Sequence, residues 1–322
     1  MTDHENDTLS VKFWGVRGSH PAPGPRTVRY GGNTPCVEVR LGEQVIILDA
    51  GTGLIGLGRD LARRPRPAAA PQSYVLLLSH LHHDHIQGFP FFAPAYQPGV
   101  SLDVYGPEAF EQALEEVFSR NQNPPLFPVA LREMGAAKHF HSLQDGEQIV
   151  LKGDIRIRSM SSHAHPGRLL IYRIEHRGLS VVYATDTEGY VGGDRRLAAF
   201  ARGADLLIHD AQYTEEHYRG LKPGLPATQG YGHSTAEMAC ELAGAAGVKQ
   251  LVLFHHDPGY DDDTITAIEC RARQLFPGTL AACEGMELFP GRTALPADKA
   301  AGTQTGERAS TAARPAALPS GG

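Results

Sequence analysis

The chain has 322 residues, of which 41% are hydrophobic and 20% charged, and it carries a net charge of −6 at pH 7. This composition is that of a globular protein with one large or two small domains, and it excludes a broad basic face for nucleic acid, although a local cationic site remains compatible with it. The four cysteines form no C-x-x-C pair, no apolar run approaches the ~20 residues of a membrane span, and the polar N-terminus shows no signal peptide. We therefore expect a cytoplasmic protein with reduced thiols and no membrane partner.

Short segments rich in Val, Ile, Leu and Tyr alternate with amphipathic segments, which predicts sheets covered by helices. The expected strands are Val11–Trp14, Cys36–Arg40, Val45–Leu48, Tyr74–Leu78, Ser101–Tyr105, Ile155–Ser159, Leu169–Ile174, Ser180–Ala184, Leu206–Ile208 and Leu251–Phe254. The expected helices are Pro107–Arg120, Ser234–Ala246 closed by Gly247, and Asp262–Leu275. An exposed loop is expected over Arg63–Ser73.

Both ends of the chain lack the apolar periodicity of a folded segment. The first ten residues are polar, and the C-terminal segment is rich in Ala, Thr, Pro, Gly and Ser. Such segments cannot bury enough apolar surface to offset the entropy of ordering. We therefore expect a disordered N-terminus over 1–10, one folded domain over 11–290, and a disordered tail over 291–322.

Metal-capable side chains are concentrated directly after the expected strand Tyr74–Leu78. His80, His82, Asp84 and His85 form the pattern H-x-H-x-D-H. Imidazoles and carboxylates are the usual ligands of zinc-like divalent ions. On a turn that leaves a strand, alternate side chains can enter neighbouring pockets, which suits two adjacent ions better than one. A solvated histidine-rich loop is the alternative interpretation.

Three further candidate ligands follow strands or lie in turns. They are His165, Asp186 and His255. Strand-end residues gather along one rim of a sheet, where sites on α/β folds form. Taken singly, each has a structural alternative as a turn former or helix cap. His163 and His256 remain open as alternatives to the two histidines.

With these residues the chain resembles the metallo-β-lactamase-fold hydrolases over roughly Val11–Phe289. The resemblance implies an α/β fold, a four-layer αβ/βα sandwich of two mixed sheets flanked by helices, with the active site on one rim. It also implies two divalent metal ions per chain, zinc in the first place and manganese or iron as alternatives. In the family pattern His80, His82 and His165 hold one ion, Asp84, His85 and His255 hold the other, and Asp186 bridges them.

The segments Phe13–Ser19, Tyr30–Thr34 and Leu48–Gly53 resemble the phosphodiesterase branch of that family, with phosphoribosyl cyclic phosphodiesterases and relatives of tRNase Z. By this resemblance Asp49 supports the ligand loop, since such carboxylates commonly fix histidine tautomers. For Arg17 we expect an exposed side chain, with bidentate pairing to a phosphate as the alternative.

His233 lies in Gly232–Glu237, directly before an expected helix. Ser234 and Glu237 have the spacing of a capping box. A helix N-terminus favours an anion, so an imidazole there can bind a phosphoryl oxygen or supply a proton to a leaving alkoxide. A matching His-Ser-Thr motif is a feature of the tRNase Z-like branch. The alternative is a histidine that only packs against the helix start.

These features predict a dinuclear metal-dependent phosphodiesterase acting on a small cyclic nucleotide or related diester. Asp84 would orient the attacking hydroxide as well as bind metal, and His233 would act on the phosphate. A precursor tRNA is less favoured, because the sequence after Tyr105–Pro107 shows no long basic or glycine-rich arm. Hydrolysis of a carbon ester, lactone, thioester or β-lactam, and a non-catalytic metal-binding regulatory module, remain alternatives. A homodimer is expected by analogy with the family.

Overall fold

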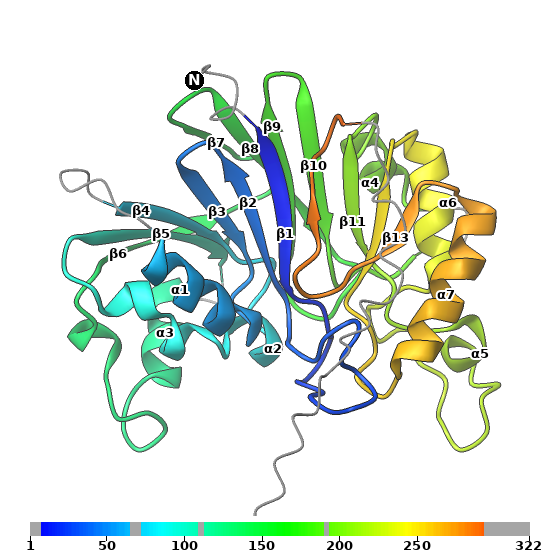
Figure 1. Cartoon of the computed structure of the whole chain (residues 1–322), viewed down its shortest axis with the longest axis horizontal. Helices are drawn as coiled ribbons and strands as arrows, with labels where there is room; N and C mark the ends of the chain where they lie inside the picture. Colours follow the sequence, from blue (N-terminus) through cyan, green and yellow to red (C-terminus); the bar gives the residue numbers. More distant parts are fainter. Residues whose placement is uncertain (1–7, 65–71, 109–112, 190–192, 293–322) are drawn as a thin grey trace, which may run out of the picture. The chain divides into compact units, whose positions relative to one another are not determined.

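The computed structural model describes residues 8–64, 72–108, 113–189 and 193–292, which include two seven-stranded sheets (Figure 1). The first sheet has the order β14 (Glu287–Leu288), β1 (Leu9–Gly15), β2 (Cys36–Leu41), β3 (Gln44–Leu48), β4 (Gln72–Leu77), β5 (Val100–Pro107), β6 (Ala137–Leu143). The second has the order β13 (Thr279–Ala281), β12 (Leu251–Phe254), β11 (Leu206–Asp210), β10 (Leu179–Ala184), β9 (Leu169–His176), β8 (Ile155–Ser162), β7 (Gln148–Leu151).

Helices cover the outer face of each sheet, as Figure 1 shows. The first sheet is covered by α1 (Gly53–Arg63), α2 (His83–Ile86), α3 (Leu114–Asn121) and the short 3₁₀ turns Phe89–Phe91, Ala93–Tyr96 and Leu131–Glu133. The second sheet is accompanied by α4 (Arg195–Phe200), α5 (Glu215–Tyr218), α6 (Ala236–Ala246) and α7 (Asp262–Leu275). The expected four-layer sandwich is therefore confirmed.

Continuous apolar strands explain the layering, because successive side chains of a strand point to opposite faces. In β4, Val75 and Leu77 pack between the two sheets. Tyr74 and Leu76 of the same strand pack against the helices on the other side. A strand that is apolar on both faces therefore needs both a second sheet and a helical layer.

Parallel strands bring the candidate site residues to one rim. Strands β3 to β6 run parallel in the first sheet, and β10 to β13 run parallel in the second. Asp49 follows β3, His80 follows β4, Asp186 follows β10, Asp210 ends β11 and His255 follows β12. The carboxyl ends of parallel strands are where α/β folds form their sites.

Two of the three expected helices need correction. Pro107 is the last residue of β5, and the helix begins only at Leu114. Residues 109–112 lie outside the described part. In α6 the N-cap is Thr235, whose side chain accepts from the Met238 N–H at 3.3 Å. The expected capping box is wrong because the Ser234 hydroxyl donates instead to the Thr187 carbonyl at 2.6 Å.

The third expected helix and the expected end of α6 are confirmed, whereas the N-terminal boundary of the folded domain differs. Helix α7 spans Asp262–Leu275 as expected, with Asp261 as N-cap, and α6 ends at Gly247 in a left-handed conformation. β1 begins at Leu9, two residues inside the segment that we expected to be disordered. Residues 1–7, 65–71 and 293–322 lie outside the described part, so the disordered ends and most of the expected loop stay predictions. Within the described residues, no helix has the length and apolar character needed to cross a bilayer.

Candidate metal centre

Asp84, His85 and His255 form a tight triangle of ligand atoms. Asp84 Oδ2 lies 3.3 Å from His85 Nε2 and 3.3 Å from His255 Nε2, and the two Nε2 atoms are 3.3 Å apart. His85 lies in α2, after β4 of the first sheet, His255 directly follows β12 of the second sheet, and both are buried. The structure therefore brings together one of the two groups that the resemblance implied.

His80, His82 and His165 form the second group. His82 Nδ1 lies 3.0 Å from His165 Nε2, and the His80 ring centroid lies 4.4 Å from that of His82 and 4.9 Å from that of His165. His163, two residues earlier in the same loop, is exposed and belongs to none of the ligand groups among the described residues. His256 is turned away from the cluster as well, with its Nε2 3.0 Å from the Ala282 carbonyl oxygen.

Asp186 stands between the two groups with one carboxylate oxygen toward each. Its Oδ1 is 3.7 Å from His80 Nε2 and 3.9 Å from His165 Nε2. Its Oδ2 is 3.2 Å from His85 Nε2 and 3.3 Å from His255 Nε2. This placement is the one that a bridging carboxylate requires.

Three features show that the cluster suits divalent metal ions. His80 Nε2 is buried and has no hydrogen-bond partner among the described residues, an arrangement that costs free energy unless a ligand completes it. The 3.3 Å separations within the Asp84 group match the roughly 3.3–3.4 Å between ligand atoms around a tetrahedral zinc-like ion. Burial also lowers the pKa of His80 well below its ordinary value, so the ring stays neutral and able to bind metal. The fold and these clusters indicate a site for two divalent metal ions.

The nitrogens on the far sides of the rings are held by fixed acceptors. His85 Nδ1–H donates to Asp49 Oδ2 at 2.8 Å, as the resemblance implied for Asp49. His255 Nδ1–H donates to Gln212 Oε1 at 2.8 Å, and His165 Nδ1–H donates to the Gly232 carbonyl at 3.2 Å. Such bonds select the tautomer that leaves Nε2 free to bind metal.

The backbone around the centre has a left-handed conformation that residues other than glycine rarely adopt. Ser19, Asp49, Asp186 and His255 all have positive φ, between 52° and 63°. Each such residue costs of order 1–3 kcal/mol and persists only where its surroundings determine it. Such residues cluster at functional sites, so their presence together at one rim indicates one here.

Close approach explains two of the glycines. A Cβ on Gly18 would lie 2.4 Å from His255 Nδ1, and one on Gly232 would lie 2.2 Å from His165 Nδ1. Gly232 also has a φ of +89°, so a side chain there would be strained as well as obstructed. Both glycines allow the chain to pass directly over a candidate ligand.

His233 is paired with a buried carboxylate at the edge of the cluster. Its Nδ1–H donates to Asp210 Oδ2 at 2.8 Å, and its ring stacks on that of His255 at 5.0 Å between centroids. Burial lowers the pKa of His233, but the Asp210 carboxylate outweighs burial and raises it to about 9. The Asp210 carboxylate therefore favours the protonated ring, whose Nε2–H has no protein partner among the described residues and can donate to a substrate.

The sequence interpretation missed Asp210, which is fully buried. Its Oδ1 accepts from the Ser234 N–H at 2.8 Å, and its Oδ2 accepts from the Asp186 N–H at 3.1 Å. It therefore fixes His233 and the backbone of Asp186 together. The available signal was its place at the end of an apolar strand, Leu206–Asp210, the same context that pointed to Asp186.

The expectation for Arg17 is wrong. Its side chain is completely buried, and its guanidinium donates to the carbonyls of Gly31, Asp257 and Tyr260 at 2.6–3.1 Å. It joins the loop between β1 and β2, called the first loop below, to the segment after His255. Its Nε and Nη1 are thus used by backbone carbonyls, while Nη2 is buried without a hydrogen-bond partner among the described residues.

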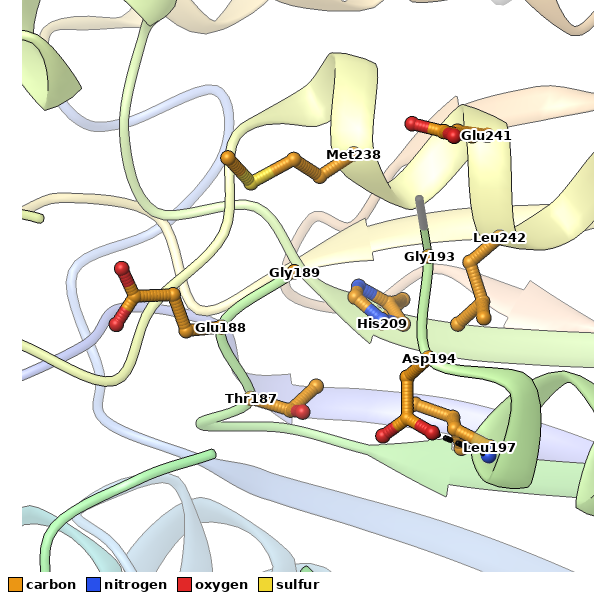
Figure 2. A pocket seen from close by; sticks show the side chains of 10 residues that line it. All are labelled: Thr187, Glu188, Gly189, Gly193, Asp194, Leu197, His209, Met238, Glu241 and Leu242. Carbon is orange, nitrogen blue, oxygen red and sulfur yellow. Dashed lines mark hydrogen bonds between the residues drawn. The ribbon is translucent and has the colours of Figure 1, made fainter. Parts of the chain in front are cut away.

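Behind Asp210, the other face of β11 carries His209, in a small pocket against α4 and α6 (Figure 2). Its ring is near Met238, Asp194 and Leu242, and the cavity of about 20 Å³ holds no more than a water molecule. In Figure 2 Glu188 points away from the His209 ring. Its carboxylate instead accepts from the Gly230 and Gly232 N–H groups, which holds the loop before His233.

Comparison with known proteins agrees with this geometry. A family profile described as a beta-lactamase superfamily domain matches residues 44–256. The ribonuclease Z of Lacticaseibacillus casei is 28% identical over 278 residues, covering 73% of this chain and 82% of that protein.

Two solved structures share the fold. The metallo-beta-lactamase fold protein YhfI from Bacillus subtilis matches with a TM-score of 0.64 at 21% identity, over 88% of this chain and 99% of its own. A diphosphatase from the PhnP family matches with a TM-score of 0.62 at 19% identity, over 87% and 97%. Because the family profile covers more than half of the chain, this protein belongs to the beta-lactamase superfamily, as its sequence led us to expect.

Proposed function

We propose that this protein is a metal-dependent hydrolase that cleaves a phosphodiester, with a small cyclic nucleotide or related diester as substrate. The observation that carries the proposal is the buried His233–Asp210 hydrogen bond of 2.8 Å beside the two candidate ligand groups, which favours a protonated imidazole there. A cation that can donate a proton suits an anionic phosphate and a leaving alkoxide better than a neutral ester. The similarity to a ribonuclease Z points to the same bond type.

Two metal ions would be held by His80, His82 and His165 on one side and by Asp84, His85 and His255 on the other, with Asp186 between them. When bound, such a pair lowers the pKa of water and neutralises phosphate charge. The histidine-rich groups and their tetrahedral spacing favour zinc, while manganese and iron accept the same ligands.

The chain's own residues then divide the remaining work. The Asp84 carboxylate, anchored by the Ser19 N–H at 2.8 Å, can accept a hydrogen bond from the attacking water and orient it. His233 Nε2–H binds a phosphate oxygen and then gives its proton to the leaving oxygen, and Asp210 stabilises its charge until that transfer.

Cleavage of RNA is the second candidate function. It is favoured by the ribonuclease Z relative, of which the alignment covers 82%. The net charge of −6 speaks against an extended phosphate-binding face, so we place the small diester first. Hydrolysis of a carbon ester or lactone would not need the His233–Asp210 pair.

The proposal is tested with the purified protein, loaded separately with zinc and manganese. We expect cleavage of bis(p-nitrophenyl) phosphate and of a cyclic or linear nucleotide, and no cleavage of a β-lactam or lactone. A precursor tRNA in the same series separates the two phosphodiester functions. Lactone or β-lactam cleavage without diester cleavage would contradict the proposal.

A further inference from the structure

We propose that a cavity beside His80 and His82 is a binding site for a nucleobase carried by the substrate phosphodiester. The inference rests on the proposed function and names the chemical group that the site selects. The cavity has a volume of about 220 Å³. His80 and His82 form one part of its wall, so a group attached to the reacting phosphorus can enter it directly.

The rest of the wall is mainly apolar. Leu81, Pro107, Val117 and Pro166 line it, from the ligand loop, the end of β5, α3 and the loop that carries His165. Sites for drug-sized ligands usually measure about 300–1,000 Å³. The smaller volume here suits one ring system, and not a whole dinucleotide or the end of a duplex.

A charged pair in the cavity wall offers hydrogen-bond partners that an unsubstituted aromatic ring could not use. Arg168 Nη1–H donates to Glu108 Oε2 at 3.0 Å, and both residues line the cavity. Their side chains are 58% and 46% exposed, so the pair contributes little by itself and can exchange partners at small cost. A guanidinium donor beside a carboxylate acceptor complements a ring edge that carries both acceptors and donors, which is what a nucleobase presents.

The first test fills the cavity. Val117→Trp projects a large ring into it, and Glu116→Trp places the same ring on the exposed side of the same helix. Two substrates share the p-nitrophenol leaving group, thymidine 5′-(p-nitrophenyl phosphate) and methyl p-nitrophenyl phosphate. For Val117→Trp we expect the ratio of kcat/KM for the nucleoside ester to that for the methyl ester to fall about tenfold or more, since an apolar pocket contact is worth about that much. Glu116→Trp keeps the ratio of the unaltered protein.

The second test removes the polar edge without changing the core. Arg168→Ala should raise KM for the nucleoside ester several-fold, while Arg120→Ala, an exposed arginine on α3, should not. If the unaltered protein cleaves both esters but Val117→Trp and Arg168→Ala leave their ratio unchanged, the nucleobase site is overturned and the diesterase stands. If the metal-loaded protein cleaves neither ester, the proposed function itself fails.

Discussion

His233 is the residue whose surroundings say most about the chemistry of this centre. His80, His82, Asp84 and His85 would serve any hydrolase of the superfamily. His233, in contrast, is hydrogen-bonded to the buried Asp210, which raises the pKa of the ring, and it stacks on His255. A proton donor beside two candidate ligand groups is of use chiefly when the substrate is an anion whose leaving group needs a proton.

Replacing His233 with alanine tests this role. We expect kcat for a phosphodiester to fall roughly 10²- to 10⁴-fold, the usual contribution of a general acid. Metal content, measured by elemental analysis, should stay the same because the seven candidate ligands remain. A loss of metal in this variant would show that His233 holds the centre together, and the role given to it here would be wrong.

The neighbouring histidines of one loop offer a matched pair of variants. His165→Ala removes a ring from the first ligand group, so we expect it to lose bound metal. His163→Ala removes an exposed ring two residues away and should change neither metal content nor activity. The metal-to-protein ratio of the two purified variants decides the assignment, and equal ratios would contradict it.

At the residue scale, the sequence predicted the candidate metal ligands better than the residues that hydrogen-bond to the site histidines. The seven candidate ligands lie together because the motif and the strand ends already placed them on one rim. Gln212 and Asp210 support His255 and His233 from behind, a relation that only the folded sheets create. The prediction for Arg17 was wrong for the same reason. Two of its three carbonyl partners, Asp257 and Tyr260, are about 240 residues away in the sequence.

At the scale of elements, the first loop acts as a cover over the Asp84 group. Gly18 passes over His255, and the Ser19 N–H binds Asp84. A Gly18→Ala variant should displace the His255 ring and lower metal affinity. Gly24→Ala, in the same loop, meets no heavy atom within 4 Å and should bind metal normally. Metal titration of both proteins gives the comparison, and an unchanged affinity for Gly18→Ala would contradict the close approach.

Helix α6 carries a second element-scale prediction. Because its N-cap is Thr235, Thr235→Ala should lower the free energy of unfolding by about 1 kcal/mol, while Thr235→Ser retains the cap. Urea unfolding of the two variants measures the difference. If Thr235→Ala is as stable as the unaltered protein, the cap contributes nothing and the start of α6 is held by the Ser234 bonds alone.

The elements themselves were predicted unevenly. Ten strands were recognised from short runs rich in Val, Ile, Leu and Tyr. Strands β6, β7, β13 and β14 were not predicted, because β6 and β7 are largely exposed and β13 and β14 have only three and two residues. Helix α1 (Gly53–Arg63) was missed because it contains three glycines, which weaken the helical signal, and packing decides it instead. Gly53 and Gly58 are required there because a Cβ would meet Trp14 and Phe92.

At the scale of the whole folded unit, the centre depends on both sheets at once. Asp84 and His85 lie in α2, after β4 of the first sheet, and Asp186 and His255 follow β10 and β12 of the second sheet. Tyr183 crosses between the two sheets, since its hydroxyl donates to Asp49 Oδ2 at 2.7 Å. No single segment of the sequence encodes the two-sheet arrangement. It was therefore predictable only from the family resemblance.

The most direct test of the central claim is a metal titration of protein that has been freed of metal with a chelator. Phosphodiester cleavage and thermal unfolding are both measured during the titration. We predict that activity returns as zinc binding approaches two ions per chain, and that Tm rises with it, because ligands that bind only the folded state stabilise it. Full activity without metal, or saturation at one ion per chain with no diester cleavage, would contradict a dinuclear phosphodiesterase.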